Sequence, residues 1–308
     1  SWENVPSKEL GNYDYLMFND IDYRNAAVRE ELKNWGHWYY ETTKVDGFRL
    51  DAVKHISSEF LIEWIDDMKA TYNRDFFFVA ENWNIEDVSE LEAYIETTGG
   101  RTQLFDSLLH HNFYLAANGG KDFNLATIFD NTLVQRNPLL AVTFVDNHDS
   151  QPLQSLESFV EFWFRPLAYA LILLRRDGIP CVFYTDVYGA TYEDDGENVE
   201  LIGVKELHDL LRIRTSLAYG TEKDYFDHPN CVGWTRSGDE EHPNSGIAVL
   251  MTNGEEGFKE MDMGIEFSGK VFVDGLGNRA EEVTINEDGK GEFFCNAGSV
   301  SVWVLKQA

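Results

Sequence analysis

The sequence is poor in cysteine and in basic residues. Its 308 residues include three cysteines, an odd number, and none has the spacing of a zinc site or a redox pair. We therefore expect Cys181, Cys231 and Cys295 to be buried free thiols, as in a reducing compartment. The 25 Lys and Arg residues stand against 54 Asp and Glu residues, a formal net charge of −29. A surface of this sign repels nucleic acid and anionic membranes and favours neutral substrates or cations as partners.

Signatures of several other protein classes are also absent. The sequence has no phosphate-binding Walker loop, no dinucleotide-binding glycine fingerprint and no Gly-x-Ser-x-Gly nucleophile turn. No apolar run is long enough to cross a bilayer, and no leader segment is recognisable. Because the chain opens on Ser1 instead of Met, we expect a piece of a longer protein, so the missing leader carries little weight.

Apolar segments alternate with amphipathic ones over the first two thirds of the chain. Strands are predicted at 47–53, 76–80, 103–109, 139–145 and 180–187, and helices at 25–43, from residue 57 onward, 85–97, 158–176 and 199–216. This alternation predicts parallel βα units. The fold class is therefore α/β, and residues 25–219 are predicted to form about five βα units, the C-terminal part of a (β/α)8 TIM barrel.

Short alternating apolar runs replace this pattern after about residue 219. They lie at 232–235, 246–252, 270–274, 281–285, 291–295 and 299–305. Asp288 and Gly289 have the sequence of a hairpin turn. Residues 220–308 are therefore predicted to form a second domain, an antiparallel β-sandwich, while residues 1–24 read as irregular.

The first predicted strand ends on an acidic residue with an arginine beside it. Arg49 and Asp51 lie on the same face, because strand side chains alternate with a period of two. A neighbouring guanidinium lowers the pKa of a carboxyl group and holds its oxygens in place, as a carboxylate nucleophile requires. A helix cap or a plain structural salt bridge is the alternative reading of this pair.

Two further strands end on acidic side chains, Glu81 and the run 146–149. Aromatic surface such as Trp83 can raise the pKa of Glu81 and suit it to general acid catalysis; a solvated Glu and a packing Trp are the alternatives. The polar run can bind sugar hydroxyls and stabilise a cationic transition state, or form an Asx-rich turn. Carboxylates at the ends of successive strands together predict an enzyme that cleaves glycosidic bonds. If two of these carboxyl groups lie about 5–5.5 Å apart, the cleavage would retain the configuration of the anomeric carbon.

Acidic residues also cluster before the first strand. Asp14, Asp20 and Asp22 lie within nine positions of one another, and His55 follows the strand. Oxygen-rich clusters bind calcium, although the spacing and glycine of an EF-hand are absent. A solvated acidic loop explains these residues equally well.

The stretches around these residues resemble the α-amylases of glycoside hydrolase family 13. Residues 47–55 resemble that family's nucleophile strand, 79–83 its acid/base strand and 144–149 the strand of its third carboxylate. The similarity spans nearly the whole chain and is greatest to the bacterial liquefying enzymes. Residues 226–231 and 293–296 resemble the cytoplasmic subgroup, so a cytoplasmic location is expected; secretion is the alternative if a leader precedes the chain.

The resemblance implies a role for each matching residue. Asp51 would be the nucleophile, Glu81 the acid/base and Asp149 the transition-state stabiliser in a retaining hydrolysis of α-1,4 bonds in starch, glycogen or maltooligosaccharides. The other matches would orient the nucleophile or bind substrate: Arg49, Lys54, His55, Trp83 and His148. Structural calcium would be bound by Asp14, Asp20 and the backbone carbonyl of His55, with Asp22 nearby.

Two departures from the family pattern are expected to matter. The family's earliest motif, its first three barrel strands and most of its inserted B domain have no counterpart, and residues 1–24 resemble the end of that insertion. Asn230 and Asn253 stand where some liquefying enzymes place acidic ligands of an additional calcium, so that additional site is predicted to be absent.

Five strands cannot close an eight-stranded barrel. The chain is therefore predicted to be a fragment, one part of a two-part enzyme, or one copy of a homo-oligomer that completes the barrel, and to be poorly active alone. A non-catalytic glucan-binding or self-associating remnant is the alternative function. A transglycosylase of the same family is a third.

Overall fold

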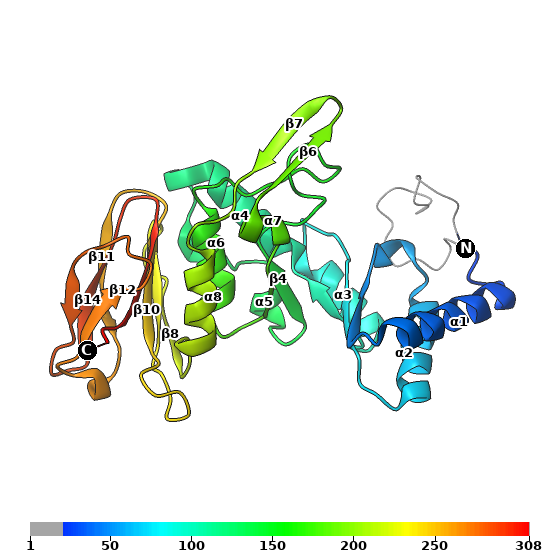
Figure 1. The fold of residues 1–308 in the computed structure, drawn as a ribbon, viewed down its shortest axis with the longest axis horizontal. Coiled ribbons are helices and arrows are strands. Elements are labelled where there is room, and N and C mark those ends of the chain that lie inside the picture. The colour runs from blue at the N-terminus through cyan, green and yellow to red at the C-terminus, as the bar shows by residue number, and fades with distance from the viewer. Residues whose placement is uncertain (1–20, 308) are drawn as a thin grey trace. The chain divides into compact units, whose positions relative to one another are not determined.

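Residues 21–307 are described by the structure, a computed structural model, and they form two compact units (Figure 1). Unit 1 comprises the described residues up to Leu108 together with Asn131–Val142, and unit 2 comprises Leu109–Asp130 and the chain from Thr143 onward. The predicted domain boundaries after residues 24 and 219 stay a prediction. No helix within residues 21–307 is both long and apolar enough to cross a membrane.

Parallel βα units form unit 1. Its strands are β1 (Gly47–Leu50), β2 (Phe77–Ala80), β3 (Gln103–Phe105) and the first half of β4 (Ala141–Phe144). Its helices are α1 (Ala26–Thr43), η2 (Val53–His55), α2 (Ser58–Tyr72), α3 (Val88–Thr97) and α5 (Leu133–Arg136). The strands pair in parallel in sequence order. The predicted parallel architecture is therefore confirmed.

Helices α1 and α2 begin where the sequence predicts. Asn25 Oδ1 accepts the N–H of Ala27 at 3.0 Å, and Ser57 Oγ accepts the N–H of Phe60 at 3.4 Å. Both contacts cap otherwise unpaired N–H groups of a first helical turn. Four apolar side chains of α2 are buried and form the face that packs on the sheet side of the helix: Leu61, Trp64, Ile65 and Met68.

Helix α1 approaches α2 most closely at a glycine, while Leu32 and Tyr40 pack against the core of unit 1. Gly36 is its one buried residue, whereas Trp35 is exposed. A Cβ atom at Gly36 would lie 2.7 Å from the Trp64 ring, so this approach requires glycine. Trp64 Nε1 also donates to the Leu32 carbonyl at 3.1 Å, which holds α1 against α2.

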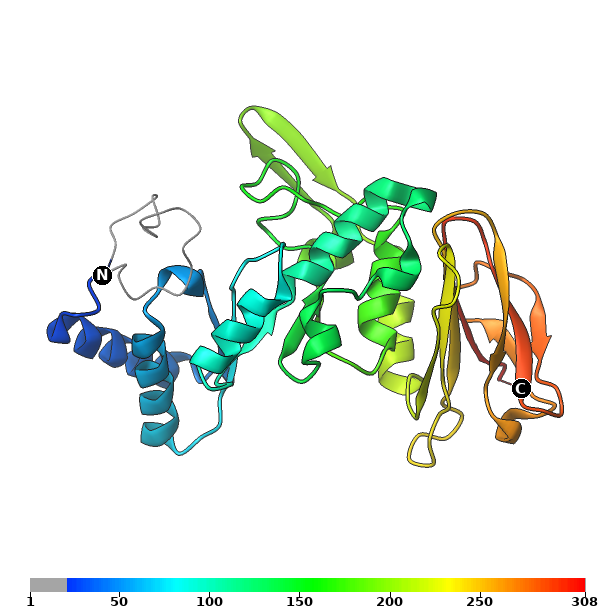
Figure 2. The same ribbon diagram turned by 180° about the vertical axis from the view of Figure 1, so that it is seen from behind.

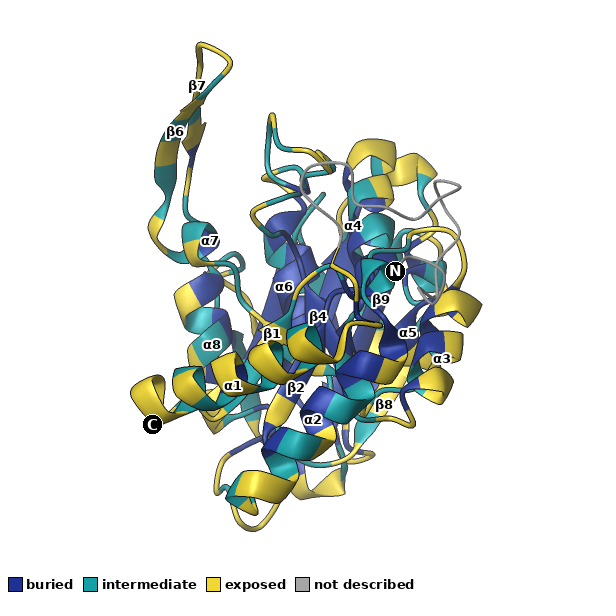
Figure 3. Ribbon diagram, turned by 90° about the vertical axis from the view of Figure 1, so that its right-hand side faces the viewer, coloured by how far each residue is buried: buried dark blue, intermediate teal, exposed yellow. Residues whose placement is uncertain are grey.

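Unit 2 continues the βα pattern with α4 (Ser107–Gly119), η3 (Gly120–Asp122), η4 (Leu125–Thr127), α6 (Arg165–Leu174), β5 (Ile179–Cys181), α7 (Tyr184–Tyr188) and α8 (Leu207–Ser216). The parallel sheet has the strand order β1-β2-β3-β4-β5. Helix α6 is buried at every position except Pro166, as its dark blue colour in Figure 3 shows. Helices α6 and α8 lie side by side in Figures 1 and 2.

Four predicted elements have clearly different bounds. The strand predicted at 180–187 spans only Ile179–Cys181, because Tyr184–Tyr188 form α7. The strand predicted at 103–109 ends at Phe105, because Ser107 begins α4. The helix predicted at 158–176 spans only Arg165–Leu174, since the preceding residues bond the polar end of β4. The helix predicted at 199–216 begins at Leu207, because its first residues belong to a hairpin.

That hairpin pairs β6 (Ala190–Asp194) with β7 (Glu197–Leu201) and projects from α7 in Figure 1. Asp195 and Gly196 form its two-residue turn, with φ values of +48° and +83°. Both residues thus have the positive φ of a type I′ turn, for which Asp-Gly is a favoured pair. The Asp-Gly pair is visible in the sequence, but the hairpin was not predicted because acidic residues interrupt the alternation of apolar side chains on both strands.

An antiparallel β-sandwich completes unit 2, as predicted. One sheet has the order β13-β12-β15-β10-β9-β8, and β11 pairs with β14. The bounds are β8 (Glu222–Tyr225), β9 (Cys231–Arg236), β10 (Ile247–Thr252), β11 (Gly257–Asp262), η5 (Ile265–Phe267), β12 (Val271–Asp274), β13 (Glu282–Thr284), β14 (Lys290–Cys295) and β15 (Val300–Leu305). Side chains of both sheets form one core, including Phe272, Phe293 and Trp303.

Two details of the sandwich differ from the prediction. Strands β8 and β11 were not predicted, because β8 has no aliphatic residue and charged side chains interrupt β11. Asp288 and Gly289 lie in a turn, but β13 and β14 pair with other strands, so the turn closes no hairpin between them. The cysteines are free, as predicted, but only Cys295 is buried; Cys231 is half-buried and Cys181 exposed.

A buried arginine joins the end of β4 to α6 and α7. Arg165 Nη2 lies 3.3 Å from Asp146 Oδ2, and Nη1 lies 2.5 Å from Asp186 Oδ1. All three side chains are at most 2% exposed. Tyr169 donates its hydroxyl proton to Asp186. Burial raises the pKa of Asp146 to about 7, and the positive charge of Arg165 opposes that rise.

Arg165→Met is expected to destabilise unit 2 strongly. It leaves two buried carboxylates without their cation, which costs about 3–5 kcal/mol. Urea denaturation followed by circular dichroism measures the loss. Arg176→Met is the matched control, because that side chain is 69% exposed and pairs only at the surface; its effect should stay within about 0.5 kcal/mol. Equal losses for the two variants would contradict the assigned role of Arg165.

Candidate active site

Asp51 and Glu81 follow directly after β1 and β2. These strands pair in parallel with Leu50 opposite Ala80, so their carboxyl ends lie at the same edge of the sheet. Backbone pairing continues one step further, because Glu81 N–H donates to the Leu50 carbonyl at 2.9 Å and Val53 N–H to the Glu81 carbonyl at 3.0 Å. The two acidic residues are thereby held beside each other.

Arg49 connects the two carboxylates. Its Nη1 lies 2.5 Å from Asp51 Oδ1, and its Nη2 lies 3.2 Å from Glu81 Oε2. The period of two predicts the contact with Asp51, but nothing local predicts the contact with Glu81. Glu81 Oε2 also accepts the N–H of Ala52 at 3.1 Å. Ala52 has a φ of +45°, a strained conformation for a residue with a Cβ atom, of the kind found at functional sites.

The two carboxyl groups have different surroundings. The Asp51 side chain is 71% exposed, whereas the Glu81 side chain is 11% exposed. Burial raises the pKa of Glu81; the Ala52 N–H and Arg49 partly oppose this rise, and the Asp51 charge adds to it. An acid that keeps its proton beside an accessible carboxylate can donate that proton to a leaving group while its neighbour attacks.

The predicted substrate residues of unit 1 lie close to this pair in the chain. Lys54 and His55 lie on the short helix η2, and Lys54 Nζ donates to the Trp83 carbonyl at 3.0 Å. Trp83 and His55 are half-buried. This contact ties the segment after Asp51 to the segment after Glu81.

In unit 2, Asp146 is the buried residue of the run after β4, Asn147 and Asp149 are half-buried, and His148 is exposed. Asp146 is buried in the network with Arg165. Asn147 Oδ1 accepts the N–H groups of Asp149 at 2.9 Å and Ser150 at 2.8 Å, so the Asx turn named as the alternative is present. These bonds leave His148 and Asp149 as the residues that a substrate could reach.

His148 is exposed and Asp149 half-buried, with His148 Nε2 3.3 Å from Asp149 Oδ2. Asp149 belongs to unit 2, whereas Asp51 and Glu81 belong to unit 1. The convergence of all three carboxylates on one substrate therefore stays a prediction.

The predicted calcium site is only partly within the described residues. Asp14 and Asp20 lie outside them. Asp22 accepts Arg24 Nε at 2.9 Å and Arg24 N at 3.0 Å, and the hydrogen bond to that guanidinium lowers its pKa. Residues 21–307 contain no group of three or more His, Cys, Asp or Glu side chains that could hold a metal. Calcium binding by Asp22 and His55 therefore stays a prediction.

Asn230 and Asn253 form what we term the amide clasp with three backbone carbonyls. Asn253 Nδ2 donates to the Gly120 carbonyl at 2.7 Å and to the Phe123 carbonyl at 2.8 Å. Asn230 Nδ2 donates to the Lys121 carbonyl at 2.7 Å and to Asn253 Oδ1 at 2.9 Å. The uncharged amide groups of Asn230 and Asn253 thus donate hydrogen bonds to these carbonyl oxygens. These two residues stand at the positions where some liquefying enzymes have acidic ligands of an additional calcium.

One aromatic pair was missed by the sequence reading. Tyr184 and Tyr188 on α7 are both exposed, with ring centroids 4.8 Å apart. Tyr184 was predicted to lie in the strand at 180–187, and Tyr188 to follow that strand. Their helical spacing of four brings them together instead, after the carboxyl end of β5.

Profiles of two protein domains match the chain. The one described as alpha amylase, catalytic domain, matches residues 10–225, and the one described as alpha-amylase C-terminal matches residues 247–304. The chain belongs to the α-amylase family. It is 48% identical over 311 residues to the cytoplasmic alpha-amylase of Escherichia coli K12, covering 99% of this chain and 62% of that protein. It is 49% identical over 307 residues to an alpha-amylase of Geobacillus stearothermophilus, covering 100% of this chain and 55% of that protein.

Solved structures of α-amylase-type enzymes have the same fold. An Anoxybacillus alpha-amylase superposes with a TM-score of 0.70 at 20% identity, over 94% of this chain and 65% of that one. A cyclomaltodextrin glucanotransferase of three-domain ABC distribution superposes with a TM-score of 0.73 at 20% identity, over 100% and 66%. The profile matches and the two curated relatives confirm the family resemblance, and these structures confirm the fold. The chain spans 55% and 62% of the two curated relatives' lengths.

Removing Arg49 is expected to raise the pKa of Glu81 further. Arg49→Gln takes away a positive charge that favours ionised Glu81, while burial and Asp51 still oppose ionisation. A carboxyl ¹³C NMR titration measures the shift. Arg101→Gln is the control, because Arg101 pairs with Asp66 in the same unit and should leave Glu81 unchanged. A lowered or unchanged Glu81 pKa in Arg49→Gln would contradict the bridging role of Arg49.

Proposed function

We propose that the protein containing this chain hydrolyses α-1,4-glucosidic bonds of starch, glycogen or maltooligosaccharides with retention of configuration. One observation carries the proposal: buried Glu81 has a raised pKa and shares Arg49 with exposed Asp51. A buried carboxyl group with a raised pKa beside an exposed carboxyl group suits the acid and the nucleophile of a double displacement.

In the first step Glu81 donates its proton to the glycosidic oxygen as the bond to the anomeric carbon breaks. Asp51 attacks that carbon and forms a glycosyl ester. Glu81, now ionised, then takes a proton from water, which attacks the same carbon and releases Asp51. Arg49 keeps the Asp51 oxygens oriented and partly compensates negative charge at Glu81.

The accessible residues after β4 complete this site in the proposal. Asp149 would stabilise positive charge at the anomeric carbon, and His148 would bind the sugar at the point of cleavage. Lys54, His55 and Trp83 would bind the leaving part of the glucan. The exposed rings of Tyr184 and Tyr188 suit stacking on sugar rings, since each offers an apolar face and a hydroxyl group.

The 308-residue chain is expected to be weakly active unless further barrel strands complete it, from a longer chain, a partner chain or another copy. Structural calcium and a cytoplasmic location also remain predictions. One relative is described as a cytoplasmic alpha-amylase, which supports the second of these.

The roles of the two carboxylates can be separated with two substrates. Glu81→Gln should lower hydrolysis of a blocked maltooligosaccharide on the order of 10²–10⁴-fold, the usual contribution of general acid catalysis. The same variant should keep its first step on a maltosyl fluoride, because fluoride leaves without a proton. Asp51→Asn should lose both reactions, because no carboxylate remains to attack.

Asp75→Asn serves as the control, since Asp75 is an exposed carboxylate of the same unit that pairs with Lys69. Mass spectrometry of the quenched reaction should find the glycosyl ester on Asp51. Full activity of Asp51→Asn, or an ester on another residue, would overturn the mechanism. Accumulation of longer glucans instead of new reducing ends would assign a transglycosylase.

A further inference from the structure

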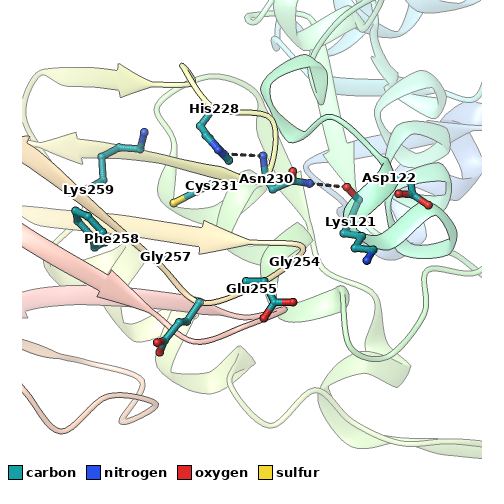
Figure 4. Close-up of a pocket in the computed structure, with 11 residues that line it drawn as sticks. Lys121, Asp122, His228, Asn230, Cys231, Gly254, Glu255, Gly257, Phe258 and Lys259 are labelled. Carbon is teal, nitrogen blue, oxygen red and sulfur yellow. Dashed lines mark hydrogen bonds between the residues drawn. The ribbon is translucent and has the colours of Figure 1, made fainter.

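A cleft lies in unit 2 where the loop around η3 meets the β-sandwich (Figure 4). It has a volume of about 450 Å³, within the range of sites for small ligands. Its lining comes from three segments that are distant in sequence: residues 121–122, 228–231 and 254–259. None of these residues has a role in the proposed hydrolysis, so the cleft needs a separate explanation.

An exposed aromatic ring forms part of one wall. Phe258 on β11 is 65% exposed. It lies opposite Phe294 on β14 in the strand register, and the two ring centroids are 6.4 Å apart. Phe294 thus supports one side of the Phe258 ring and leaves much of its surface in water. An apolar face held in this way can stack on the apolar face of a ligand ring.

His228 supplies a hydrogen-bond donor of known orientation. Its Nδ1 accepts the N–H of Asn230 at 3.1 Å, drawn as a dashed line in Figure 4. A ring nitrogen that accepts carries no proton, so the neutral imidazole has its proton on Nε2. His228 lines the cleft, and its Nε2–H can therefore donate to a ligand hydroxyl.

The charged groups of the lining nearly balance. Lys121 and Lys259 are the positively charged lining residues, and Asp122, Glu255 and Glu256 are the negatively charged ones. Lys259 is already paired with Asp227. There is no excess of positive charge for a phosphate group, and residues 21–307 hold no metal-binding cluster. A neutral ligand rich in hydroxyl groups can use the carboxylates as acceptors and the remaining groups as donors.

Hydrogen bonds connect the segments that line the cleft. The amide clasp fixes the η3 loop to Asn230 and Asn253, and Asn253 is buried. Gly254 has no side chain, and a Cβ atom there would meet Lys121 Cβ at 3.4 Å and Asn230 Cβ at 3.8 Å, both ordinary contacts. A longer side chain at Gly254 would therefore extend among cleft-lining residues without backbone strain.

We propose that this cleft is a non-catalytic binding site for a short stretch of α-glucan. This inference rests on the proposed function, which makes α-glucan the neutral polyhydroxyl ligand that the protein meets. A sugar ring would stack on Phe258, while its hydroxyl groups bond His228 and the carboxylates. Binding of a long glucan there would raise its local concentration at the catalytic residues, an advantage that a short substrate cannot gain.

The test is a calorimetric titration with maltoheptaose, together with electrophoresis through gels that contain soluble starch. Phe258→Ala removes the stacking surface, and Gly254→Leu fills the cleft. Each should weaken the cleft's affinity for maltoheptaose by about tenfold, as expected for loss of one aromatic anchor or of the space beside it. Phe258→Trp should restore binding. Ile265→Ala is the control, because Ile265 is 74% exposed in the same sandwich and does not line the cleft.

Hydrolysis rates separate this site from the catalytic one. Phe258→Ala should slow hydrolysis of soluble starch and leave hydrolysis of a short blocked maltooligosaccharide unchanged. Wild-type binding by both Phe258→Ala and Gly254→Leu, or equal loss in Ile265→Ala, would overturn the glucan site. Phe258-dependent binding by a protein whose barrel is complete, without any hydrolysis, would support the cleft and overturn the proposed function instead. Thermal melting of each variant verifies that it is folded.

Discussion

A single buried cation determines how the polar end of β4 is built. Arg165 lies between Asp146 and Asp186, with none of the three side chains more than 2% exposed. A buried charge without its partner costs several kcal/mol, so the end of β4, the start of α6 and the helix α7 must keep their mutual positions. The turn at Asn147 depends on this arrangement, and so does the accessibility of His148 and Asp149.

Arg49 also lies between two carboxyl groups, but at a partly exposed position. One guanidinium contacts both Asp51 and Glu81, yet the two carboxyl groups differ because Glu81 is buried and Asp51 is not. Burial is therefore the main cause of the raised pKa of Glu81. A pair of aspartates or glutamates at equal depth would not be divided into an acid and a nucleophile in this way.

Features that depend on a short stretch of sequence could be predicted for this molecule. Contacts between segments that are distant in the sequence could not. The caps Asn25 and Ser57 and the change from parallel to antiparallel strands follow from short stretches of sequence. The contact of Gly36 with Trp64 and that of Arg49 with Glu81 join residues about thirty positions apart, so no local period indicates them. The family resemblance supplies the roles of the acidic strand ends. Residues 226–231, several of which line the cleft beside Phe258, were matched only to a subgroup of that family and indicated no cleft.

The amide clasp has a consequence for how this part of the molecule responds to its solution. Its donors are hydrogen atoms covalently attached to Asn230 and Asn253, and its acceptors are three backbone oxygens and the side-chain oxygen of Asn253. A joint of this kind has no exchangeable ion to lose. Chelating agents and dilution therefore leave it intact, and its strength is the same whether the surroundings are rich or poor in free divalent ions.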